Sequence, residues 1–97
     1  MNLSSQHIDK IRSFFSCLPV KKAYLFGSYS RNEADENSDI DILVELDHTY
    51  PIGIKFFTYK DELEYILKKR VDLVSYEGLS KYIKPLVDSD KVLIYER

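Results

Sequence analysis

The 97 residues, of which 44% are hydrophobic, are enough for one domain with one core and leave no room for a second substrate-binding domain. A formal net charge of -2 and short, scattered basic clusters argue against binding to a nucleic-acid backbone. Cys17 is the only cysteine, which excludes an internal disulfide, and no stretch is typical of a signal peptide or a membrane span. We therefore expect a single domain over residues 1–97, in the reducing cytoplasm, without membrane or direct nucleic-acid contact.

Hydrophobic spacing predicts the secondary structure in chain order. A first helix is expected over residues 5–18, with Ser4 or Ser5 as N-cap and Pro19 closing it. A short strand over 22–26 follows, and the polar residues 28–38 hold at most a short helix. A second strand (39–46), a helix (51–70) and a third strand (71–75) come next. A helix over 79–88 should bend or begin a new turn at Pro85, and 92–95 predicts a fourth strand. The predicted order is α-β-α-β-α-β-α-β.

Two carboxylates share one face of the second predicted strand. Side-chain alternation puts Asp39 and Asp41 on the same side. The opposite side, which must face the core, carries only apolar residues: Ile40, Ile42, Val44 and Leu46. Neighbouring carboxylates repel each other unless they share a proton or a cation. Because hard oxygen ligands suit Mg²⁺, this strand predicts a metal site.

Asp72 is a lone acid among apolar residues in the third predicted strand, where a buried, unpaired charge is costly. If the second and third strands are neighbours, its carboxylate joins those of Asp39 and Asp41. Three such acids bind one or two metal ions that bridge triphosphate oxygens. The alternative is a surface acid that pairs with a basic neighbour, namely Lys68, Lys69 or Arg70.

The pair Gly27-Ser28 follows the first predicted strand and precedes a helical turn, so its backbone N–H groups can face an anion. Gly27 allows a phosphate to approach closely, and Ser28 adds a hydroxyl donor. Since only residues 29–38 connect the first two strands, these strands should run antiparallel. That excludes a Rossmann or P-loop unit, which needs a parallel crossover.

The stretch GSYSRNEADENSDIDILVE, residues 27–45, resembles the signature of the DNA polymerase β-like nucleotidyltransferase superfamily. That signature is Gly-Ser, a spacer of roughly ten residues, Asp-x-Asp, and later a third Asp on a strand. Within the superfamily, the chain looks like the minimal nucleotidyltransferase (MNT) antitoxins over nearly its whole length. The resemblance implies the nucleotidyltransferase fold, of the α/β (α+β) class, with a small mixed β-sheet flanked by helices.

The resemblance also implies roles for individual residues. Gly27 and Ser28 would contact the phosphates of a nucleoside triphosphate, and Asp39 and Asp41 would ligate two Mg²⁺ ions. Asp72 would ligate the catalytic ion and help to deprotonate the acceptor hydroxyl. Two further matches, Arg31 and Ser38, are expected at the nucleotide; for Arg31 the alternative is an ordinary salt bridge with Glu33 or Asp35.

By the same resemblance, the reaction would transfer AMP from ATP to a tyrosine hydroxyl of a cognate HEPN-domain ribonuclease toxin and so neutralise it. One alternative is a non-catalytic antitoxin that neutralises its partner by binding alone. Another is nucleotidylation of a small molecule, for which related enzymes usually carry an additional helical domain. Exposed tyrosines, such as Tyr29 or Tyr50, are candidates for packing against an adenine ring or for self-modification.

Overall fold

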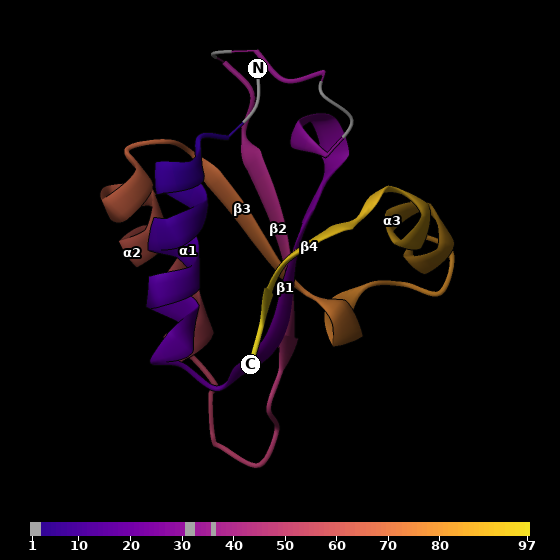
Figure 1. The fold of residues 1–97 in the computed structure, drawn as a ribbon. Coiled ribbons are helices and arrows are strands. Elements are labelled where there is room, and N and C mark those ends of the chain that lie inside the picture. Colours follow the sequence, from indigo (N-terminus) through magenta and orange to yellow (C-terminus); the bar gives the residue numbers. More distant parts are fainter. Residues whose placement is uncertain (1–2, 31–32, 36) are drawn as a thin grey trace.

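The computed structural model describes residues 3–30, 33–35 and 37–97, with Ser28 described by its backbone alone. Figure 1 shows one sheet with helices on both of its faces. The elements in chain order are α1 (Ser5–Ser16), β1 (Val20–Phe26), the 3-10 turn η1 (Gly27–Tyr29), β2 (Ile40–Leu46), α2 (Lys55–Leu67), β3 (Val71–Ser75), the 3-10 turn η2 (Tyr76–Gly78), α3 (Lys84–Asp90) and β4 (Val92–Glu96).

The sheet has the strand order β3-β2-β1-β4. Strand β1 runs antiparallel to both β2 and β4, whereas β2 and β3 are parallel. The parallel pair needs a crossover, and α2 supplies it. The predicted α/β class with a mixed sheet is therefore confirmed, as are the antiparallel pairing of the first two strands and the contact between the second and third.

Helices α1 and α2 cover one face of the sheet (Figure 1), and the main core lies between them and the strands. The predicted alternation of β2 is confirmed, because its four core-facing residues are at most 7% exposed: Ile40, Ile42, Val44 and Leu46. On α1, Ile11 and Phe15 are fully buried, one helical turn apart. The Ser4 hydroxyl accepts a hydrogen bond from the His7 N–H at 3.2 Å, which confirms the predicted N-cap.

The other face of the sheet is covered by α3, which buries Val87 against Tyr24 and Leu43. The Tyr24 hydroxyl donates to the Glu45 carboxylate at 2.7 Å. Burial, together with this hydrogen bond, raises the pKa of Tyr24 to about 12. The Lys91 ammonium lies 4.6 Å from the centre of the Tyr24 ring and joins α3 to the sheet. Helix α3 thus occupies the middle of this face.

Several predicted boundaries differ from the structure at the ends of elements. Helix α1 ends at Ser16, two residues early, and α2 is shorter than the predicted 51–70 at both ends. Strand β2 begins at Ile40, so Asp39 lies just outside it. Between β1 and β2 the described residues contain only the turn η1 in place of a helix. Pro85 lies in the first turn of α3, where its missing N–H costs nothing, so it begins the helix and does not bend it.

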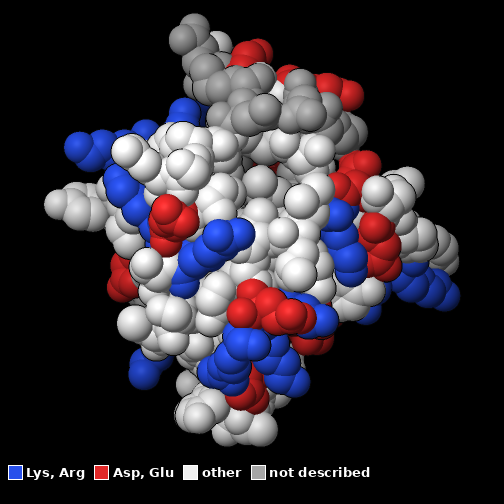
Figure 2. All heavy atoms as spheres, in the orientation of Figure 1, with Lys and Arg blue, Asp and Glu red and all other residues white. Residues whose placement is uncertain are grey.

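Two ion pairs join β4 and the C-terminal residue to the rest of the chain at the end of the sheet opposite Asp39. Arg97 Nη1 lies 2.6 Å from Asp47 Oδ2, and Lys22 Nζ lies 3.4 Å from Glu96 Oε2. Figure 2 shows acidic and basic side chains interleaved around the place where Figure 1 marks the C-terminus. The helices of the described residues are too short or too polar to cross a membrane.

Candidate active site

The turn after β1 brings backbone directly against a carboxylate. Gly27 has a φ of 72°, a conformation that side chains with a Cβ rarely adopt. A Cβ built on Gly27 would overlap with Oδ2 of Asp41. The turn is held by Ser30, whose N–H and hydroxyl both donate to the Gly27 carbonyl, at 3.1 and 2.8 Å. The backbone conformation therefore favours glycine at this position, and any other side chain would also have to displace the Asp41 carboxylate.

Two of the three predicted carboxylates lie side by side on neighbouring strands. Asp41 of β2 is directly opposite Asp72 of β3, and on its other side it is opposite Phe26 of β1. Residues paired in this way point to the same face of a sheet. Here it is the face away from α1 and α2, beyond the part that α3 covers.

Asp72 differs from the prediction in one respect. The reasoning from the sequence placed it in a buried strand, but its side chain is exposed. Strand β3 lies at the edge of the sheet and buries only Val71 and Leu73, on the opposite face. The argument from the cost of a buried charge was therefore wrong. The position of Asp72 beside Asp41 follows instead from the parallel register of β2 and β3.

Asp39 precedes β2 and has a cationic partner. Its Oδ1 forms an ion pair with Arg70 Nε at 3.0 Å, and both side chains are at least half exposed. For Asp72, the alternative prediction was an ion pair with Lys68, Lys69 or Arg70. No such pair occurs among the described ion pairs, in which Arg70 contacts Asp39 instead. Within the part of the chain that the structure describes, no three His, Cys, Asp or Glu side chains already lie close enough together to hold a metal ion.

The donor chemistry nevertheless fits a hard divalent cation. Asp41 and Asp72 are in register on one open face, and Asp39 lies two residues before Asp41. All three offer carboxylate oxygens, which Mg²⁺ prefers, and partial exposure leaves room for the water molecules that Mg²⁺ retains. Asp41 also contacts the Gly27 backbone, so a phosphate bound at this turn would lie next to the same carboxylates.

The other residues that were expected near the nucleotide lie outside the group formed by Gly27, Asp41 and Asp72. Ser38 forms a local turn: its hydroxyl accepts a hydrogen bond from the Asp35 N–H at 3.0 Å and donates to Asp35 Oδ1 at 3.3 Å. Arg31 lies outside the described residues. Tyr29, which was expected to be exposed, is only 5% exposed, and its hydroxyl is buried without a hydrogen-bond partner among the described residues. Tyr50 is 56% exposed, as expected.

Two residues connect α2 to the site in ways that were not predicted from the sequence. Glu64 Oε2 accepts a hydrogen bond from the Val71 N–H at 2.9 Å, and Glu64 Oε1 pairs with Lys60 at 3.1 Å. These bonds, first that from Val71 and then that from Lys60, lower the pKa of Glu64. The second residue is Arg70, which contacts Asp39. The i,i+4 spacing of Lys60 and Glu64 was visible in the sequence, but the bond to Val71 was not.

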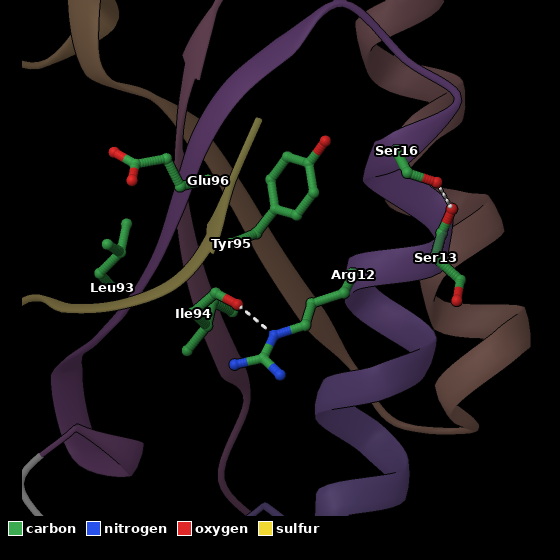
Figure 3. A pocket seen from close by; sticks show the side chains of 7 residues that line it. All are labelled: Arg12, Ser13, Ser16, Leu93, Ile94, Tyr95 and Glu96. Carbon is green, nitrogen blue, oxygen red and sulfur yellow. Dashed lines mark hydrogen bonds between the residues drawn. The ribbon is translucent and has the colours of Figure 1, made fainter.

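A well-defined hollow of the described surface lies elsewhere, between α1 and β4. A cavity of about 560 Å³ separates α1 from β4, and Figure 3 shows the seven side chains that line it. Its polar groups are engaged with each other: Arg12 Nε donates to the Ile94 carbonyl at 2.7 Å, and Ser16 Oγ donates to the Ser13 carbonyl at 2.7 Å. It contains neither a pair of carboxylates nor a glycine turn. The candidate site therefore stays at the end of the sheet that carries Asp39 and Asp41, which we call the open end.

Comparison with known proteins shows the family of the chain. The model of the family described as nucleotidyltransferase domain matches residues 5–95. The protein adenylyltransferase MntA of Thermococcus cleftensis is 36% identical over 93 residues, which are 96% of this chain and 90% of the relative.

Two solved structures are similar to the chain in fold. A chain from the crystal structure of a toxin–antitoxin pair with AMP-PNP has a TM-score of 0.80 and 28% identity, over 93% of this chain and 73% of the other. A chain from the complex of tri-AMPylated Shewanella oneidensis HEPN toxin with MNT antitoxin has a TM-score of 0.76 and 25% identity, over 98% and 74% of the two chains.

Proposed function

The chain belongs to the nucleotidyltransferase domain family, and from this we propose that it is an antitoxin that transfers AMP from ATP to a tyrosine hydroxyl of a cognate HEPN-domain toxin. The observation that carries the proposal is the arrangement around Asp41. This carboxylate touches the backbone of Gly27 on one side and is in register with Asp72 on the other. A phosphate-binding turn, a metal ligand and a candidate proton acceptor thus follow one another across three strands.

The relatives support the identity of the substrates. One is named as a protein adenylyltransferase, one structure contains the ATP analogue AMP-PNP, and another contains an AMPylated HEPN toxin. We propose the cytoplasm as the compartment in which both proteins meet.

In the proposed mechanism, backbone N–H groups of the turn at Gly27 and Ser28 bind the phosphates of ATP. Asp39, Asp41 and Asp72 hold Mg²⁺, which supplies charge neutralisation at the α-phosphate and the leaving pyrophosphate. Arg31 and Ser38 are proposed as further nucleotide contacts. Two ions are expected.

The reaction itself is an in-line displacement. The tyrosine oxygen of the acceptor forms a bond to the α-phosphorus, and the bond from that phosphorus to the bridging oxygen of the β-phosphate breaks. Asp72 takes the hydroxyl proton. Pyrophosphate leaves with the electron pair, and the toxin retains an AMP group on its tyrosine.

Transfer of label from ATP to the partner tests this proposal. The purified chain, the HEPN-domain protein encoded beside it and Mg²⁺ are incubated with ATP labelled at the α-phosphate. The wild type should label the partner, and the double variant Asp39→Ala plus Asp41→Ala should not. A matched control is Asp61→Ala plus Glu62→Ala, which removes two exposed acids from α2. Undiminished labelling by the first variant would falsify the assignment.

A second function is favoured by one observation. The Asp39 carboxylate is already paired with Arg70, and the three aspartates do not converge in the described structure. An antitoxin that acts by binding alone would need no such convergence. The two functions are separated by co-expression: if the double aspartate variant still suppresses the toxicity of the partner completely, neutralisation does not depend on catalysis.

A further inference from the structure

Arg70 contacts the segment that carries Asp39 in three ways. Its Nε forms an ion pair with Asp39 Oδ1 at 3.0 Å, and its Nη2 donates a hydrogen bond to the Asn37 carbonyl at 3.1 Å. Its own carbonyl accepts a hydrogen bond from the Ile40 N–H at 2.9 Å. One residue of the α2–β3 turn therefore binds positions 37, 39 and 40, immediately before and at the start of β2.

The same turn is fixed from the side of α2. Lys68 ends the helix in the left-handed conformation, with a φ of 56°, and its N–H donates to the Glu64 carbonyl at 2.8 Å. The Glu64 carboxylate then accepts the hydrogen bond from the Val71 N–H. Arg70 directly precedes Val71, whose N–H is bound by Glu64, and the Arg70 side chain contacts Asp39. Contacts on both sides therefore hold Arg70 in place.

We propose that Arg70 is a positioning residue that orients the Asp39 carboxylate for the metal ion of the proposed transferase. This inference rests on the proposed function. The guanidinium forms an ion pair with Oδ1 and is itself held by its hydrogen bond to the Asn37 carbonyl. Partners of this kind hold ligating carboxylates in the conformation that binds metal, and their loss typically weakens metal affinity by about 10–100-fold.

The positive charge of Arg70 has an opposing effect, because it repels a cation. That repulsion is screened, since the Arg70 side chain is 74% exposed to water. Orientation, in contrast, depends on the geometry of the contacts that Arg70 makes with Asp39 and Asn37. A planar guanidinium can bond Asp39 and Asn37 at the same time, which the point charge of a lysine does less well. We therefore expect orientation to dominate.

Metal binding without turnover provides the test. Mn²⁺ is titrated into the intact chain in the presence of a non-hydrolysable ATP analogue, and free Mn²⁺ is followed by electron paramagnetic resonance. Arg70→Gln should raise the Kd for Mn²⁺ about 10-fold or more, and Arg70→Lys should also raise it, though less. Lys69→Gln, which removes the same charge from a residue without an ion pair among those described, should leave the Kd within about 2-fold.

An unchanged or lower Kd for Arg70→Gln overturns the inference, the latter because it would make the arginine a competitor of the metal. Asp39→Asn distinguishes this failure from that of the proposed function. If Asp39→Asn leaves Mn²⁺ binding unchanged, the metal site itself is wrong. If Asp39→Asn weakens binding while Arg70→Gln does not, only the role of Arg70 fails.

A second readout needs no metal. Hydrogen exchange of the metal-free protein should become faster over residues 37–40 in Arg70→Gln, because the segment loses its side-chain contacts, and should stay unchanged in β1 and β4. Lys69→Gln serves as the control here too. Equal exchange over 37–40 in the wild type and in Arg70→Gln overturns the inference, since the guanidinium would then hold nothing in place.

Discussion

Strand β2 is flanked by an aspartate at each end, and each aspartate pairs with an arginine. Asp39 precedes the strand and bonds Arg70; Asp47 follows it and bonds Arg97. The two pairs differ in their surroundings. The Asp39 side chain is 50% exposed, whereas that of Asp47 is 12% exposed. The same two residue types therefore form an open pair at one end of the strand and an enclosed pair at the other.

The enclosed pair is fully satisfied. Asp47 Oδ1 accepts hydrogen bonds from the Thr49 hydroxyl at 2.6 Å and from the Thr49 N–H at 3.1 Å, and Oδ2 accepts one from Arg97. These bonds, first those of the Thr49 and Arg97 side chains, lower the pKa of Asp47 to about 2. Both oxygens of Asp47 are thus engaged within the chain, so this end stabilises the fold.

The open end departs from ordinary rules of stability. Gly27 has a positive φ and contacts a carboxylate, and Asp41 and Asp72 are adjacent acids. Tyr29 buries a hydroxyl that has no hydrogen-bond partner among the residues that the structure describes. Such features are expected where function, not stability, determines the sequence. The comparison predicts that changing the aspartate of the open end affects activity more than folding, and that changing the aspartate of the enclosed end does the opposite.

The largest effect should come from exchanging the two aspartates for asparagine. Asp39→Asn removes a proposed metal ligand, and we expect AMP transfer to fall by at least about 100-fold, because metal stabilisation contributes several kcal/mol. Its melting temperature should hardly change, since exposed ion pairs contribute little. Asp47→Asn should lower the melting temperature and leave transfer by the folded protein intact. Label transfer and thermal melting of both variants check this, and equal behaviour of the two would break the comparison.

Next in size is the effect of a methyl group at Gly27. Gly27→Ala should destabilise the fold by about 2–4 kcal/mol, because the strain of a positive φ adds to the overlap with Asp41. Gly53→Ala is the matched control: its φ is 50°, but the space around it is open, so only about 1 kcal/mol of strain is expected. Urea denaturation measures both. A difference near zero would mean that the contact with Asp41 relaxes freely.

A smaller effect concerns acid stability. Asp47 has an ordinary pKa of 3.8 and a lowered pKa in the folded chain, so its ionised form stabilises the fold. This contribution is complete above about pH 4 and is lost as the pH falls towards about 2. The melting temperature of the wild type should therefore decrease over this range more steeply than that of Asp47→Asn. Parallel curves for the two proteins would contradict the role given to Asp47.

The smallest effect is expected for a buried hydroxyl. Tyr29→Phe removes an unpaired group, so the free energy of unfolding should stay equal or increase by up to about 1 kcal/mol. Tyr24→Phe should instead lower it by about 1 kcal/mol, because the Tyr24 hydroxyl donates to Glu45. Denaturant titration separates the two. A clear loss of stability in Tyr29→Phe would show that its hydroxyl has a partner after all.

Local patterns predicted much of this protein. The alternation of β2 requires only that apolar residues face the core, and the short link after Gly27 requires antiparallel strands. Contacts that depend on how the elements are arranged in three dimensions could not be predicted from those patterns. The exposure of Asp72 depends on β3 lying at the sheet edge, and the burial of Tyr29 depends on a 3-10 turn that has no sequence periodicity. The contact of Arg70 with Asp39 arises because a left-handed residue reverses the chain after α2.

The position of β4 has a consequence for how the protein is made. Strand β1 lies between β2, its neighbour in the chain, and β4, which follows much later, and the bond from Arg12 to Ile94 joins positions 82 apart. Contacts of such separation form slowly, because closing a long loop costs entropy. A nascent chain on the ribosome can pair β1 with β2 well before β4 emerges. Until then one edge of β1 stays open, and an open edge invites aggregation with other chains.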